Sequence, residues 1–182
     1  DGLLMVHLEV REVDWRPDGD AAPGIVLRAF AERGERASIP GPLIRVPEGT
    51  TIAASVSNPL SRGTLVVRGL STRGVRGGAQ DTLQITAGTT REVRFMAGAP
   101  GTYYYSGQIV GAADTTVAMN AELHGAYVVD ERGARRAADR VFVIGLWAKK
   151  PRPGGIVNRS DVMRFTINGR SWPQTERLTY AV

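Results

Sequence analysis

Cysteine is absent from this sequence of 182 residues, and histidine occurs only twice, at His7 and His124. Without a thiolate, the chain can form no disulfide, no thiolate-bound zinc or iron–sulfur site, and it has no cysteine nucleophile. It can also build no blue-copper centre within itself, because such a centre requires a cysteine sulfur. The lack of cysteine says little about the compartment in which the protein works.

Long apolar runs are absent too, and none approaches the roughly 18 residues that a membrane-spanning helix needs. We therefore expect no membrane span. No amino-terminal signal peptide is visible, although a mature exported chain would look the same. Lysine occurs only at Lys149 and Lys150, so nearly all of the 23 basic residues are arginine, and the net charge is +5. The arginines are spread through turns and strand faces without a recognition helix, so we expect no nucleic-acid partner.

The 22 glycines and ten prolines favour turns and strands over helices. In residues 4–10, apolar side chains alternate with polar ones, which is typical of a half-buried strand, and His7 falls on the polar face. The other segments of strand character in this part of the chain are residues 25–31, 43–46, 51–58, 64–70, 81–85, 91–95, 102–105 and 122–130. Turn chemistry separates them and no helical period is sustained, so the sequence predicts an all-β sandwich.

Residues 131–139 are polar and arginine-rich and form the best domain boundary. We expect a first domain over 1–132, a linker over 133–139 and a further unit over 140–182. Residues 140–147 are apolar on both faces, which predicts a buried strand, and 163–167 predict another that turns at Asn168-Gly169. So few strands cannot make an independent sandwich. They dock on the first domain, pair with another chain, or open a second domain, and we favour the last. The open edges also leave room for a homo-oligomer.

Four segments in order resemble the multicopper oxidase family. Residues 39–49 (IPGPLIRVPEG) resemble its "PGPLIRVxEGD" signature, and residues 99–105 (APGTYYY) its "PGTYWYH". Residues 123–130 and 165–173 resemble, respectively, its "GLYGALIV" segment and the opening of its second domain. The resemblance implies a Greek-key sandwich of the cupredoxin type, plastocyanin-like, followed by the first strands of a second one. It further implies an exported protein (periplasmic, cell-envelope or extracellular) whose parent enzyme couples one-electron oxidation of a substrate to dioxygen reduction at copper.

The family's copper ligands have no counterpart in this chain. Its motif "HWHG" falls on residues 66–69 and its "HSH" on residues 106–108, so the ligand positions hold Val66, Arg68, Ser106 and Gln108. An alkyl group cannot bind copper, a guanidinium repels it, and neutral hydroxyl and amide oxygens bind it weakly. We therefore predict no metal-binding, cofactor-binding or catalytic residue here, and a scaffold role for this part of an oxidase. Whether the chain belongs to an active oxidoreductase is left open.

His124 is no substitute ligand, because it takes a position where the family often has an aromatic residue, and we expect it to pack or lie at the surface. We assign Met5, Met96, Met119 and Met163 to the core or to gap-filling. The Gly- and Arg-rich residues 71–80 predict a plain loop, with an anion cradle as the weaker alternative. No nucleophile elbow and no glycosidase carboxylate pair is visible.

Two other functions remain open at this point. The first is a copper-free, cupredoxin-like interaction protein of the cell envelope, whose partner is the remainder of a cupredoxin domain or another chain. The second is a small-ligand or carbohydrate-binding sandwich that uses the aromatic strand Tyr103–Tyr105, in which at least one ring must belong to the core. The motifs "HPxHxHG" and "HCHxxxH" in further sequence would favour the oxidase.

Overall fold

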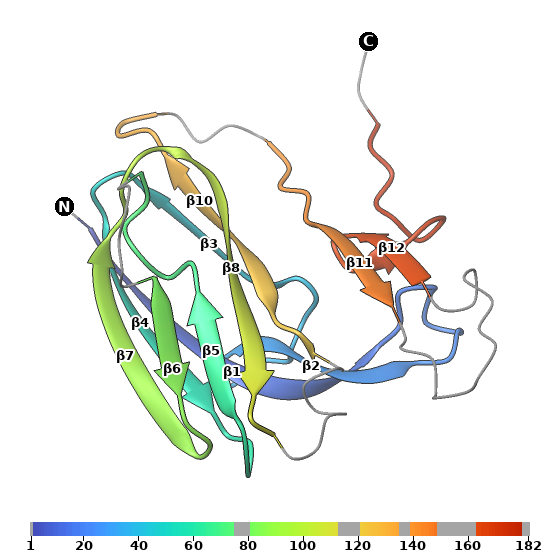
Figure 1. Cartoon of the computed structure of the whole chain (residues 1–182). Helices are drawn as coiled ribbons and strands as arrows, with labels where there is room; N and C mark the ends of the chain where they lie inside the picture. Colours follow the sequence, from blue (N-terminus) through green and yellow to red (C-terminus); the bar gives the residue numbers. More distant parts are fainter. Residues whose placement is uncertain (1, 75–80, 113–120, 135–138, 149–162, 180–182) are drawn as a thin grey trace.

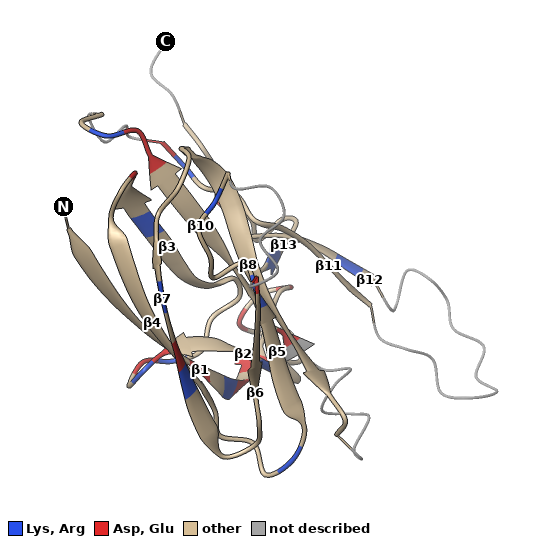
Figure 2. Cartoon of the chain, turned by 60° about the vertical axis from the view of Figure 1, so that its left-hand side comes forward, with Lys and Arg blue, Asp and Glu red and all other residues tan. Residues whose placement is uncertain are grey.

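The computed structural model describes residues 2–74, 81–112, 121–134, 139–148 and 163–179. Every regular element in these ranges is a β-strand, and two five-stranded sheets face one another as a sandwich (Figure 1). The all-β cupredoxin-type sandwich expected from the sequence is confirmed. The described ranges contain no helix that could cross a lipid bilayer. Basic and acidic residues are scattered over the strands and turns (Figure 2).

The first sheet has the strand order β7-β4-β1-β2-β9, and the second has the order β3-β10-β8-β5-β6. The strands of the first sheet are β1 (Leu3–Trp15), β2 (Ile25–Glu32), β4 (Thr51–Asn58), β7 (Thr89–Met96) and β9 (Ala121–Glu122). Those of the second are β3 (Gly41–Pro47), β5 (Thr64–Arg68), β6 (Thr82–Ile85), β8 (Gly101–Val110) and β10 (His124–Asp130). Strands β1 and β4 pair in parallel, as do β3 and β10.

The core lies between the sheets and follows the period-two patterns of the sequence. Along β8, Tyr105 is fully buried and Tyr104 is 69% exposed, so the aromatic strand does divide between core and surface as expected. The Tyr105 hydroxyl donates to the carbonyl oxygen of Pro42 at 2.7 Å, and its ring packs on Phe30 with centroids 5.5 Å apart. This hydrogen bond satisfies a buried polar group and ties the first residues of β3 to β8 at the centre of the second sheet.

Strand β1 belongs to two structural environments. Its first half pairs with β4, and its second half pairs with β2 as far as Trp15. The strand is therefore longer than the alternating pattern of residues 4–10 predicted. At that end lies a third sheet of order β11-β12-β13, formed by β11 (Ile144–Ala148), β12 (Met163–Ile167) and β13 (Arg170–Ser171) (Figure 1). The described part of the chain after residue 140 therefore contacts the first sandwich. Docking was one of the three expected arrangements, and the favoured one, the opening of a second domain, stays a prediction.

The third sheet is held by a buried contact and by ion pairs at its rim. Trp15 donates from Nε1 to the carbonyl oxygen of Gly169 at 2.8 Å, and its ring meets Trp147 edge-on with centroids 6.0 Å apart. Around this contact, Arg164 pairs with Asp18 at 2.7 Å. Because the rim pairs are solvent-exposed, the two tryptophans supply most of the docking energy.

A second anchor ties the boundary segment to the second sheet. The Arg45 guanidinium makes a two-pronged contact with the Asp130 carboxylate, at 2.9 and 2.8 Å, and reaches Asp139 at 2.7 Å. The hydrogen bonds to the two carboxylates raise the pKa of Arg45. A forked guanidinium–carboxylate pair fixes orientation as well as distance, so the polar boundary is attached to the sandwich at Asp139.

Two expectations from the sequence were wrong. The segment 140–147 is not buried on both faces: β11 begins only at Ile144, which is 79% exposed, and within β11 only Trp147 packs inward. The apolar face of this sheet points to solvent instead of lying in a core. Met5 and Met96 are 59% and 55% exposed, so they do not fill the core. Met119 lies outside the described residues.

Candidate functional site

The strand register brings together the four positions that the resemblance equates with copper ligands. Arg68 on β5 lies opposite Ser106 on β8, and Val66 lies opposite Gln108. The residues that alternate with them, such as Tyr105 and Ile109, are buried in the core. All four positions therefore share the outer face of the second sheet, where family ligands would have to converge, but they present an alkyl group, a guanidinium, a hydroxyl and an amide. This donor set does not fit a copper cluster.

His124 is a direct neighbour of this face. It lies opposite Ser106 across the β8–β10 pairing, and its Nδ1 is 3.4 Å from a carboxylate oxygen of Glu122. Both side chains are largely buried, with 23% and 17% of their surface exposed. The part of the chain that the structure describes contains no group of three or more His, Cys, Asp or Glu side chains placed to hold a metal ion. The absence of metal ligands here stays a prediction.

Burial changes the acid–base properties of this pair. It raises the pKa of Glu122 to about 7, because a carboxylate loses hydration inside the fold, and it lowers the pKa of His124 for the same reason. Near neutral pH the pair thus comprises an uncharged imidazole and a carboxyl group that is only partly ionised. Such a pair can accept or release one proton at the pH of most cells.

A cleft of about 500 Å³ opens beside this pair, between β8, β10 and residues 141–146. Most of its wall is apolar, and its polar side chains include those of Glu122, His124 and Ser106. Sequence reasoning missed Glu122 as a site residue. The only signal was its spacing, because side chains two residues apart in an extended chain fall on the same face. Nothing in the sequence showed that residues 141–146 would fold back over that face.

The pKa of Glu122 predicts a pH-dependent stability. A carboxyl whose pKa rises from 4.5 to about 7 on folding destabilises the fold increasingly as pH climbs from about 5 to 7, because the unfolded chain ionises freely. The free energy of unfolding of Glu122→Gln should therefore rise relative to that of the wild type as the pH increases. We expect this difference to grow by on the order of 2 kcal/mol between pH 5 and pH 8. Urea unfolding at several pH values measures this difference. Parallel pH profiles for the two proteins would contradict the prediction.

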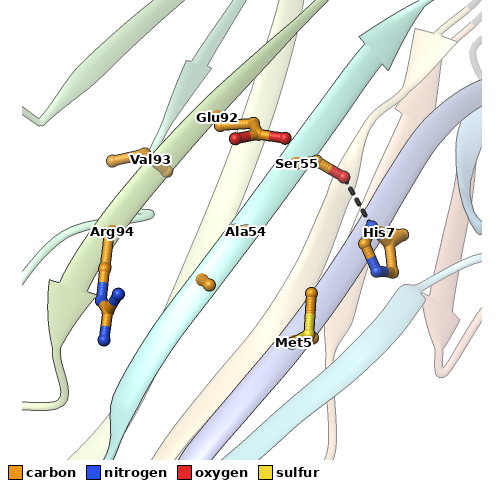
Figure 3. A pocket seen from close by; sticks show the side chains of 8 residues that line it. Met5, His7, Ala54, Ser55, Glu92, Val93 and Arg94 are labelled. Carbon is orange, nitrogen blue, oxygen red and sulfur yellow. Dashed lines mark hydrogen bonds between the residues drawn. The ribbon is translucent and has the colours of Figure 1, made fainter.

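His7 lies on the outer face of the other sheet, away from His124. It borders a hollow of about 300 Å³ with Met5, Glu92 and Arg94, and its Nδ1 is 2.7 Å from the Ser55 hydroxyl (Figure 3). Its position on the polar face of β1 agrees with the alternation of the sequence. Since the two histidines occupy different sheets, the fold does not combine them into one site.

Arg73 has a structural role in the part of the 71–80 loop that is described. It donates to the carbonyl oxygen of Tyr104 at 2.9 Å, and its guanidinium carbon lies 5.3 Å and 5.6 Å from the ring centres of Tyr103 and Tyr127. These contacts attach the loop to β8 through hydrogen bonding and cation–π attraction. Residues 75–80 lie outside the described ranges, so the anion-cradle alternative for the whole loop stays a prediction.

Comparison with known proteins identifies the family. A family model described as multicopper oxidase matches residues 36–134, more than half of the sequence. The chain belongs to the multicopper oxidase family. A search of curated proteins finds no match. The matched region of this multicopper oxidase family member contains β3 to β10 and therefore the whole outer face described above.

Solved structures show the same fold. A copper nitrite reductase from Nitrosomonas europaea has a TM-score of 0.63 at 21% identity, covering 92% of this chain and 57% of its own. The multicopper oxidase mgLAC has a TM-score of 0.63 at 22% identity, covering 97% and 57%, respectively. A blue copper oxidase from Nitrosomonas europaea has a TM-score of 0.57 at 22% identity, covering 97% and 56%. The chain thus spans a little over half the length of these structures, and at such identities the likeness concerns the fold alone.

Proposed function

We propose that this chain is a scaffold segment of a multicopper-oxidase protein that holds no copper of its own. The donor set on the outer face of β5 and β8 carries this proposal. In place of four imidazoles, the converging positions offer Val66, Arg68, Ser106 and Gln108. A permanent positive charge at Arg68 opposes a cation at that place, whereas the fold itself is retained. The segment would then supply a domain surface, and the copper and substrate chemistry of the parent protein would lie elsewhere.

The proposed organisation has a first cupredoxin domain over 1–132, a linker over 133–139 and the opening strands of a second cupredoxin domain over 140–182. The third sheet supports this division, because one of its faces is apolar and exposed. Cross-strand partners on that face are Ile144 with Ile167 and Leu146 with Phe165. An exposed apolar sheet face of this kind is typical of a surface that another layer covers. The remainder of a cupredoxin domain, in the same protein or in another chain, would be that layer.

Copper content tests the scaffold proposal. After reconstitution with copper and desalting, we expect less than about a tenth of an equivalent by elemental analysis, with no defined paramagnetic signal, because the donor set is weak. The variant His7→Ala/His124→Ala is the matched control, since it removes both imidazoles and should give the same value. About one equivalent or more, lost in the double variant, would contradict the proposal and make the histidines ligands.

A copper-free interaction protein of the cell envelope is the second candidate. The cleft beside Glu122 favours it, because a hollow with apolar walls and a few convergent polar groups is the usual form of a binding site. Both candidates imply an exported protein. They differ in the parent protein, which holds further copper ligands in the first case and none in the second.

A further inference from the structure

The Glu122 carboxylate is nearly buried, and the described part of the chain gives it no charged partner. Its side chain is 17% exposed, and within the described ranges its one polar contact is the Nδ1 atom of His124 at 3.4 Å. That imidazole is uncharged near neutral pH, because burial lowers its pKa. A buried carboxylate without a cation or hydrogen-bond donors is costly, so the site favours any cation that can reach it.

The cleft gives such a cation access to Glu122, and it has room for the apolar part of the molecule that carries the charge. Its volume of about 500 Å³ is that of a small-molecule site. The aromatic side chains Tyr104 and Phe142 line it and are 69% and 46% exposed. Aromatic faces attract ammonium groups, while Ile144 and Leu146 provide aliphatic surface nearby.

A metal ion is a poorer occupant than an organic cation. Divalent metals in proteins take several His, Cys, Asp or Glu ligands, and the described residues bring only Glu122 and His124 together here. A metal would also leave the apolar walls of the cleft without a partner. An ammonium group needs only one carboxylate, and the apolar part of the molecule that carries it can lie against the aromatic side chains of the cleft.

We propose that the cleft between β8, β10 and residues 141–146 binds a small organic ammonium ion with an apolar body. The cationic head lies at Glu122, where it forms a charge-assisted hydrogen bond, and the body lies along Tyr104 and Phe142. Copper content and amine binding are separate measurements, so the failure of this inference can be distinguished from the failure of the scaffold proposal.

Calorimetric titration of the full chain at pH 8 tests the proposal, with 2-phenylethylamine as the probe. The uncharged 2-phenylethanol and the anionic 3-phenylpropionate are matched in shape and should bind at least about tenfold more weakly, since only the ammonium can pair with the carboxylate. Glu122→Gln should weaken amine binding by about the same factor. The control variant Glu92→Gln removes a carboxylate from the hollow on the opposite sheet and should bind as the wild type does.

Three results of the amine titrations would overturn the proposal. They are no measurable amine binding by the folded wild type, equal affinity for the amine and the alcohol, and equal weakening in Glu122→Gln and Glu92→Gln. Release of the amine by one equivalent of Cu²⁺ in the wild type, absent in Glu122→Gln, would assign the site to a metal and would also overturn it. Circular dichroism of both variants establishes that they are folded, and Phe142→Ala provides a second test that leaves the carboxylate intact.

Discussion

Trp15→Ala releases the three-stranded sheet from the sandwich while the sandwich stays folded. The indole of Trp15 packs with Trp147 and Leu27 in a small cluster of its own, separate from the main core. Its Nε1 is also the donor to the carbonyl oxygen of Gly169. Removing it creates a cavity and leaves that carbonyl unpaired, for a loss of about 3–5 kcal/mol in docking. The rim ion pair of Arg164 with Asp18 is too exposed to compensate.

Hydrogen exchange measures this release strand by strand. In Trp15→Ala, amides of β11 and β12 should exchange at least about a hundredfold faster, while those of β4 and β8 keep their protection. Trp172→Ala is the matched control, because Trp172 follows the same sheet but is 84% exposed, and its removal should change protection little. Uniform loss of protection throughout the chain would show instead that the sandwich and the third sheet unfold as one unit.

Gly125→Ala should destabilise the sandwich by about 2–3 kcal/mol. A Cβ atom at this position would overlap the hydroxyl oxygen and Cζ of Tyr105 and lie 2.6 Å from its Cε1. The ring cannot move aside easily, because it is fully buried, packs on Phe30 and donates to Pro42. Glycine at this place in β10 is therefore required by the close approach of the tyrosine on β8.

Thermal unfolding measures the effect of Gly125→Ala, and we expect the midpoint to fall by roughly 5–10 °C for a domain of this size. Gly2→Ala is the comparison, since the nearest atom to its new Cβ would be 3.8 Å away, an ordinary contact. An unchanged midpoint for Gly125→Ala would mean that the tyrosine ring has room to shift.

Local patterns predicted the sandwich because most of its strands have one buried face. Leu8 and Val10 alternate with polar neighbours, and Tyr105 alternates with Tyr104, so the period of two is visible in the letters. The sequence pattern did not predict the contact of Trp15 with the third sheet. Trp15 follows a charged stretch at the end of β1, where the strand has left the sandwich and pairs only with β2, so the alternation no longer reports the core.

The site was less predictable than the fold because it depends on contacts between distant segments. The family motifs alone predicted that Arg68 and Ser106 occupy positions where the family has copper-ligating histidines. The cleft beside Glu122 was not visible, since residues 141–146, which are distant in the sequence, line it together with β8 and β10. The prediction that residues 140–147 are buried on both faces failed at Ile144, which is exposed. An apolar pattern on both faces does not distinguish a strand inside a core from a strand with one apolar face exposed.

The hydrogen bond from Trp15 to Gly169 has a consequence for the timing of synthesis. Its two residues are 154 positions apart in the chain. At typical elongation rates of about 5–20 residues per second, the indole waits roughly 8–30 s on the ribosome before its acceptor exists. During that interval the second half of β1 exposes an aromatic side chain beside an unpaired strand edge. Exposed features of this kind are bound by chaperones and promote aggregation of nascent chains.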